Sequence, residues 1–159
     1  SRSLDAALPH ALASSLRHDG LVRGRVMFWV PLLVGVGLGG ATVALMVLGG
    51  VLNQRGTWAT TMVAIASFYV VFAIQSGDTL EIIVHTGLAA GFAALAIIGA
   101  RTSSWILAAA LLAHGIFDVI VGSVIANPAP GWWGPFCLGV DVVLAIALAT
   151  MLWRGRTLD

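Results

Sequence analysis

A histidine and an aspartate stand four residues apart in the middle of a long apolar segment of this sequence. His114 and Asp118 lie on one face of a helix if the segment is helical, because side chains at i and i+4 project to the same side. Ionisable side chains are rare and costly inside hydrocarbon, and where they occur they usually serve a function. The pair therefore indicates acid–base chemistry or metal binding within a membrane.

Two other apolar segments carry a similar pair of polar residues. Glu81 and His85 are four residues apart in one segment, and Cys137 and Asp141 are four residues apart in another. Imidazole and carboxylate groups transfer protons in catalysis, and together they suit zinc, iron or manganese as ligands. The candidate catalytic residues are Glu81, His85, His114, Asp118 and Asp141. All of them except Glu81 are also candidate ligands of a divalent metal.

The composition places the chain in a membrane. Of its 159 residues, 59% are hydrophobic and 9% are charged, whereas a soluble domain carries about 25% charged residues. Nothing indicates the clustered basic face that nucleic-acid binding requires. Lysine is absent, which excludes Schiff-base chemistry because that chemistry needs a lysine amine. Cys137 is the only cysteine, so no disulfide can form within the chain.

Five apolar segments are long enough to cross a bilayer as helices, which takes about 20 residues. The breaks between them carry polar and turn-forming residues, such as Asn53 to Gly56 and Asn127 to Gly131. We therefore predict an all-α integral membrane protein, a five-transmembrane-helix bundle that forms a single domain over residues 26–159. The predicted spans cover roughly residues 26–52, 57–74, 79–100, 104–125 and 132–153.

Residues 1–25 precede the predicted bundle. Between Ser3 and Arg17, leucine and alanine recur at helical spacing, which favours an amphipathic helix lying on the membrane surface. Pro9 falls inside this pattern and weakens it. A disordered tail is therefore the alternative for this segment.

The order of the predicted spans brings the polar residues to one half of the membrane. The second and fourth loops lie on the same side, because the chain crosses the bilayer twice between them. Glu81 and His85 follow the second loop, the pair in the fourth span precedes the fourth loop, and Asp141 follows it. Three carboxylates thus share one leaflet, and no arginine lies within the spans to pair with them. They must be protonated, bind a metal with the histidines, or line a hydrated path for protons or cations.

Each polar residue also has a purely structural explanation. Glu81 is placed where it would stabilise the start of a helix through the helix dipole. His85 can be a core histidine, and the pair in the fourth span can join two helices by a hydrogen bond. Cys137 can be a small packing residue. Asp141 is the hardest to explain in this way, because it lies well inside an apolar run.

Small and aromatic residues indicate how the bundle packs. Gly35-x3-Gly39 and Gly87-x3-Gly91 allow close approach of helices, and we expect them to pack within the chain. Three tryptophans flank the fifth span, as they would in an interfacial aromatic belt. If the polar residues act on a substrate, we expect four neighbours to line its pocket: Phe117, Trp132, Trp133 and Cys137.

The C-terminal third resembles a family of small, uncharacterised multi-pass bacterial membrane proteins. Where that family often has further histidines after the aspartate, this chain has Val121 and Gly122, which counts against a His-rich metal site. The resemblance implies the fold and the position of the site, and it implies no activity. We expect the protein to be located in a bacterial inner membrane. The shared pattern is H-x3-D, then N-P, then C-x3-D, and it falls on His114, Asp118, Asn127, Pro128, Cys137 and Asp141.

Two better-known groups are similar in kind, without a motif-level match. Emopamil-binding-type sterol isomerases use intramembrane histidine and glutamate residues to move protons on a sterol. Alkaline ceramidase and progestin-receptor-like hydrolases use histidine and aspartate around zinc, with an H-x3-H spacing that this chain lacks.

These observations favour a membrane-embedded enzyme that acts on a lipophilic substrate such as a lipid, sterol or isoprenoid. The substrate would enter from the bilayer between the third, fourth and fifth spans. The chemistry is either acid–base isomerisation or cyclisation, or metal-assisted hydrolysis. One alternative is a small transporter or ion-binding protein that uses the same residues as a proton or cation path. Five spans lack the inverted repeat of many transporters, although a homo-oligomer would supply symmetry. A scaffold without chemistry is the other alternative.

Overall fold

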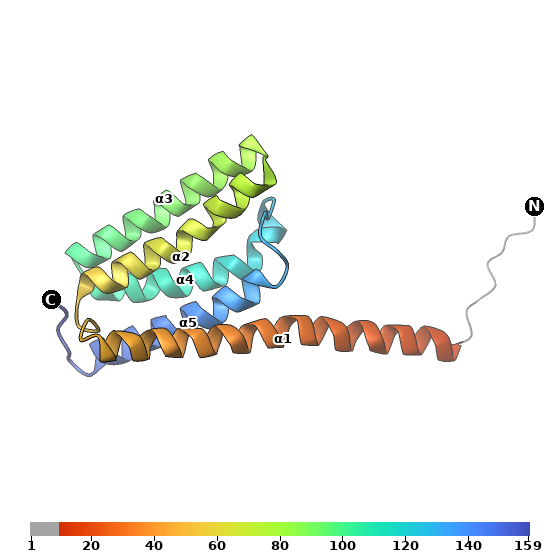
Figure 1. The fold of residues 1–159 in the computed structure, drawn as a ribbon, viewed down its shortest axis with the longest axis horizontal. Helices are drawn as coiled ribbons and strands as arrows, with labels where there is room; N and C mark the ends of the chain where they lie inside the picture. The colour runs from red at the N-terminus through yellow and green to blue at the C-terminus, as the bar shows by residue number, and fades with distance from the viewer. Residues whose placement is uncertain (1–9) are drawn as a thin grey trace, which may run out of the picture.

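The computed structural model describes the backbone from His10 to Asp159 and the side chains from Val26 onward. Over these residues the chain is all-helical and forms five helices joined by short turns (Figure 1). The predicted N-terminal surface segment, residues 1–25, lies outside the described side chains and stays a prediction. The helices are α1 (His10–Leu48), α2 (Arg55–Ser76), α3 (Thr79–Arg101), α4 (Ser104–Val124) and α5 (Trp133–Trp153).

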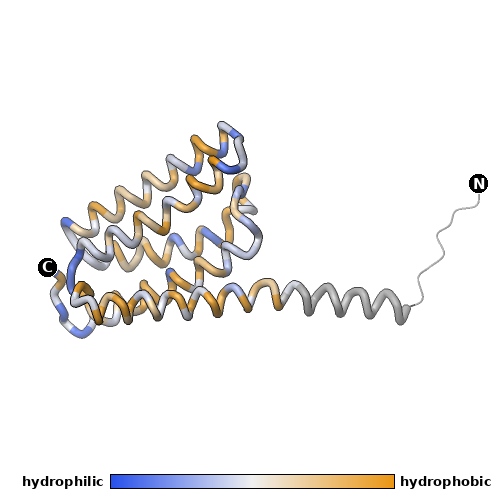
Figure 2. The backbone as a smooth tube through the Cα atoms, in the orientation of Figure 1, coloured by the Kyte–Doolittle hydropathy of each residue, from blue (hydrophilic) through white to orange (hydrophobic). Residues whose placement is uncertain are grey.

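All five helices are long and apolar enough to cross a membrane, which confirms the predicted fold class. Their outer faces expose large apolar side chains, among them Leu33, Ile83 and Ile146, and hydrophilic residues concentrate at the turns (Figure 2). The first apolar helix ends at Leu48, a few residues earlier than predicted. Gly49 and Gly50 follow it, and Gly50 adopts a φ of 68° that stops the helix.

The helices pack in a fixed order. α2 and α3 form an antiparallel pair that lies against α4, α4 packs on α5, and α5 packs on α1. Among the described residues α3 makes no contact with α5. The expected substrate cavity between the third, fourth and fifth spans stays a prediction, and the structure adds that α2 also packs on α4 beside α3.

Two apolar clusters fill the interior, and the polar residues lie between them. The larger cluster includes Leu111 of α4 and Leu144 of α5. The smaller cluster includes Val121 of α4 and Cys137 of α5, together with Tyr69 of α2. Along both α4 and α5 the buried polar residues fall between these positions in the sequence. Blue patches inside α4 and α5 mark this layer in Figure 2.

Glycines set the distance between α1, α4 and α5. Gly35 and Gly39 of α1 lie against the α5 backbone near Phe136 and Val140, as we expected for packing within the chain. Gly87 and Gly91 of α3 have no neighbouring atom within 4 Å of the place where a side chain would start, so the same expectation is wrong for them. Their face of α3 is exposed in the chain.

Candidate functional site

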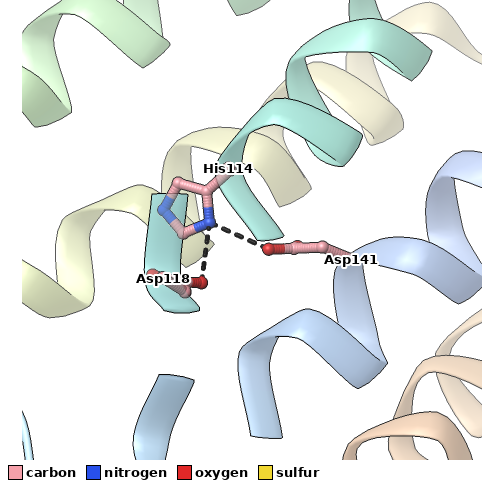
Figure 3. A group of neighbouring side chains, drawn as sticks. All are labelled: His114, Asp118 and Asp141. Atoms are coloured by element: carbon pink, nitrogen blue, oxygen red, sulfur yellow. Dashed lines mark hydrogen bonds and ion pairs between the residues drawn. The ribbon is translucent and has the colours of Figure 1, made fainter. Parts of the chain in front are cut away.

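Three ionisable side chains meet between α4 and α5. The Nδ1 atom of His114 lies 2.8 Å from Oδ2 of Asp141 and 3.2 Å from Oδ2 of Asp118. Figure 3 shows both carboxylates turned toward this one nitrogen, with the second ring nitrogen pointing away from them. One ligand atom from each residue can be chosen so that all three lie within 4.8 Å of one another.

The helical register of α4 and α5 brings these residues together. On α4, Leu111, His114, Asp118 and Val121 follow the spacing of one helix face, so the polar pair belongs to the same stripe as the core residues. Asp141 is in the corresponding stripe of α5. The sequence thus places the three groups at the helix–helix interface, away from the lipid.

Two glycines allow the helices to approach closely enough for this contact. A methyl group added to Gly115 of α4 would lie 3.0 Å from Cβ of Asp141. One added to Gly134 of α5 would lie 2.5 Å from the carbonyl oxygen of Asp118. Because any side chain at these positions would push the helices apart, the small residues hold the carboxylates at hydrogen-bond distance from the imidazole.

The three groups are almost completely buried. The exposed fractions are 1% for His114, 2% for Asp118 and 0% for Asp141. Nδ1 carries at most one hydrogen, and the better hydrogen bond goes to Asp141. Both oxygens of Asp118 and Oδ1 of Asp141 have no hydrogen-bond partner. Buried carboxylate oxygens without partners are costly, so the cluster has acceptors that call for a cation or for protons.

No arginine among the described side chains can supply that positive charge. Arg55 begins α2, Arg101 ends α3, and Arg154 and Arg156 follow α5, so all four lie at helix ends. The described ion pairs within 4.0 Å are those of His114 with its two carboxylates. Even a protonated imidazole balances only one of the two negative charges.

Aromatic rings surround the cluster. The ring of Phe92 on α3 lies edge-on to that of His114, with centroids 4.8 Å apart, and Tyr69 of α2 lies 6.5 Å from it. Phe117 packs against both Tyr69 and Phe92. Sequence reasoning placed Phe117 here but missed Tyr69 and Phe92. Tyr69 is the only tyrosine in the chain, and a lone phenol within an apolar span was the available signal.

Tyr69 connects the cluster to His85. The two rings stack nearly parallel, with centroids 5.3 Å apart and an interplanar angle of 13°. The Tyr69 hydroxyl is buried without a hydrogen-bond partner, and the Tyr69 ring lies edge-on to that of His114. This side chain therefore stands between His85 and the three-residue cluster.

The structure places His85 and Glu81 beside the cluster and not in it. Nε2 of His85 lies 2.9 Å from the backbone oxygen of Ala126 and donates to it, since a carbonyl only accepts. The group of possible metal ligands found among the described residues does not include His85. Glu81 is partly exposed in the first turn of α3, and its Oε2 atom is buried and unpartnered. The second and fourth loops do lie at one end of the bundle, as predicted (Figure 1).

The remaining predicted residues divide between the interior and the surface. Cys137 is a buried free thiol that packs in the smaller apolar cluster with Tyr69. Trp133 is buried against Phe72, with ring centroids 4.8 Å apart, so it does not belong to an exposed interfacial belt. Trp132 and Trp153 are exposed, as such a belt requires.

This arrangement suits a divalent cation. Zinc bonds of about 2.0–2.2 Å to nitrogen and oxygen in tetrahedral geometry separate neighbouring ligand atoms by about 3.4 Å. The nitrogen–oxygen distances of 2.8 Å to Asp141 and 3.2 Å to Asp118 would therefore need to widen by about 0.6 and 0.2 Å. One imidazole and two carboxylates form a donor set that zinc, iron and manganese all accept.

Comparisons with known proteins give no assignment: no family model, no curated protein and no solved structure matches this chain. The resemblance to small bacterial membrane proteins and to emopamil-binding-type isomerases stays a prediction.

Proposed function

We propose that this multi-pass membrane protein is an enzyme that uses a divalent metal ion, held by His114, Asp118 and Asp141, to act on a lipophilic substrate. One observation supports the proposal above the others. Three ligand atoms converge in a buried site where three of the four carboxylate oxygens have no hydrogen-bond partner, and no described arginine forms an ion pair with them. A cation at this point would satisfy all of these acceptors together.

The side chains have separate roles in this proposal. Asp118 and Asp141 supply the negative charge, and His114 supplies the nitrogen ligand. A three-residue ligand set leaves coordination positions for a water molecule or a substrate oxygen. Bound metal activates such a water or polarises a carbonyl group, which favours hydrolysis of an ester or amide in a lipid.

The surroundings support a lipophilic substrate. The rings of Tyr69, Phe92 and Phe117 form an apolar wall beside His114, and all five helices suit a bilayer. Metal-bound water is more reactive in a site that excludes bulk water. A substrate from the bilayer would meet this wall before it reached the polar residues.

A metal-free acid–base enzyme is the second candidate. The 2.8 Å hydrogen bond between His114 and Asp141 favours it, because a carboxylate that fixes an imidazole is a common arrangement in proton transfer. The isomerisations and cyclisations predicted from the sequence belong to this class. A cation carrier is the third candidate, and it predicts flux across the membrane without chemical turnover.

Metal analysis of the purified protein separates the metal enzyme from metal-free acid–base chemistry, and turnover separates it from a cation carrier. We expect about one zinc, iron or manganese ion per chain in the wild type, and loss of that ion in both Asp118→Asn and Asp141→Asn. Asp159→Asn is the matched control, because it removes a carboxylate that is exposed beyond the end of α5. A wild type without metal, or metal that remains in both site variants, would exclude the metal enzyme and leave acid–base chemistry.

A further inference from the structure

A small cavity lies at the end of the bundle where the α2–α3 and α4–α5 loops meet. Its volume is about 250 Å³, and its polar lining comes from Asp78, Glu81 and His85, with Ala126 on the opposite side. The rest of the lining is apolar. Among the side chains that the structure describes, no arginine lines the cavity, so its lining there is negative at the end of the bundle nearest to the buried cluster.

Every free polar side-chain atom of the lining is a hydrogen-bond acceptor. Nε2 of His85 donates to the Ala126 carbonyl, so neutral His85 presents a lone pair at Nδ1. That atom has no partner, although His85 is only 1% exposed and lines the cavity. Oε2 of Glu81 is likewise buried without a partner. Such a lining recognises a cation or another hydrogen-bond donor and disfavours an anion.

Helix capping does not account for these groups. Asp78 caps α3, since its Oδ1 accepts from the backbone N–H groups of Leu80 and Glu81. That carboxylate already compensates the positive end of the helix dipole. The Glu81 carboxylate therefore adds negative charge beyond that of the cap. A carboxylate that only stabilised the helix dipole could stay in solvent, whereas Oε2 of Glu81 is buried.

The lining leads to the cluster through one further side chain. His85 stacks on Tyr69, and Tyr69 packs in one apolar cluster with Cys137 and lies edge-on to His114. Polar atoms without partners thus follow one another from the cavity at Glu81, through His85 and Tyr69, to the carboxylates of the cluster.

We propose that this cavity is the entry site through which cations reach the His114–Asp118–Asp141 cluster. The role as a metal entry path rests on the proposed function, because a buried metal site needs a route from water. Glu81 attracts the cation by its charge, the Nδ1 atom of His85 replaces part of its hydration, and the Tyr69 ring contacts both His85 and His114.

The single cysteine provides a test that does not depend on a resident metal. Silver ion reacts with a thiol to form a silver thiolate and releases one proton, so its arrival at Cys137 can be followed by loss of the free thiol. We expect Glu81→Gln to slow silver labelling of the purified protein by roughly 3- to 30-fold, the effect of one nearby charge at an intermediate dielectric constant. His85→Phe keeps an aromatic ring against Tyr69 but removes the lone pair, and it should slow labelling as well.

Two controls make the result specific. Asp159→Asn removes a charge at the other end of the bundle and should leave the silver rate unchanged, as should Glu81→Gln with a neutral thiol reagent. If Glu81→Gln labels with silver at the wild-type rate, or if the neutral reagent slows to the same degree, the entry site is overturned. A wild type that holds no metal but shows the Glu81-dependent silver rate would overturn the proposed function and leave the cation entry site standing.

Discussion

Replacing glycine by alanine should lower the stability of the protein at Gly134, which contacts the α4 backbone, and raise it slightly at Gly87, which has no neighbour. In Gly134→Ala the new Cβ would lie 2.5 Å from the Asp118 carbonyl oxygen. Carbon–oxygen contacts of this kind are normally about 3.3 Å or longer, so α4 and α5 must separate by roughly 0.8 Å. Overpacking of this kind costs about 1–3 kcal/mol.

The separation should also reach the site. If half of it persists at Asp141, the 2.8 Å hydrogen bond to His114 lengthens to about 3.2 Å. We therefore expect Gly134→Ala to weaken this hydrogen bond as well as to lower stability. Gly87→Ala is the matched control, since no atom lies within 4 Å of the added group. Alanine in place of glycine within a helix should stabilise by about 0.5–1 kcal/mol.

Thermal unfolding measures both effects through the native thiol. Cys137 is buried, so a thiol-reactive dye becomes fluorescent when the chain unfolds. At about 2–4 °C per kcal/mol, Gly134→Ala should unfold about 2–12 °C below the wild type, and Gly87→Ala should unfold at or slightly above it. If Gly134→Ala keeps the wild-type unfolding temperature, the close contact of Gly134 with the Asp118 carbonyl does not set the distance between α4 and α5.

Three further outcomes follow from the structure. Removal of metal by a chelator should lower the unfolding temperature, since an ion at 100 times its Kd stabilises by about 2.7 kcal/mol, and Asp118→Asn should abolish this difference. Tyr69→Phe should leave thermal stability nearly unchanged, because the hydroxyl has no partner to lose; a large destabilisation would show that this hydroxyl is bonded. Trp58→Phe should destabilise by about 1–3 kcal/mol in the same dye assay, because it leaves the Leu52 carbonyl without the Trp58 indole donor, and an unchanged unfolding temperature would contradict that bond.

The helices were predictable because a membrane span requires a long run of apolar residues, which is visible in the sequence. Long apolar runs bounded by polar turns fix both the number of helices and their approximate ends. The fourth and fifth helices carried the strongest signals, because His114, Asp118 and Asp141 are ionisable. Such side chains are not tolerated on the face of a helix that contacts lipid, so they must face another helix. Their convergence followed from the order of the loops.

The helix order was not predictable in the same way. In lipid both faces of a helix can be apolar, so hydropathy does not mark which face meets another helix. This is why α2 was left out of the expected site and Tyr69 was missed. The same limit applies to glycines: Gly35 packs against α5 whereas Gly87 has no neighbour, although both belong to the same G-x3-G pattern.

X-ray absorption at the edge of the bound metal tests the central proposal most directly. We expect nitrogen and oxygen ligands at about 2.0–2.2 Å, with the signature of one imidazole from His114 and carboxylates from Asp118 and Asp141. The imidazole signature should disappear in His114→Gln. A sulfur ligand near 2.3 Å would place the ion at Cys137 instead, and an unchanged spectrum in His114→Gln would place it outside the cluster. Either result would contradict the metal centre proposed between α4 and α5.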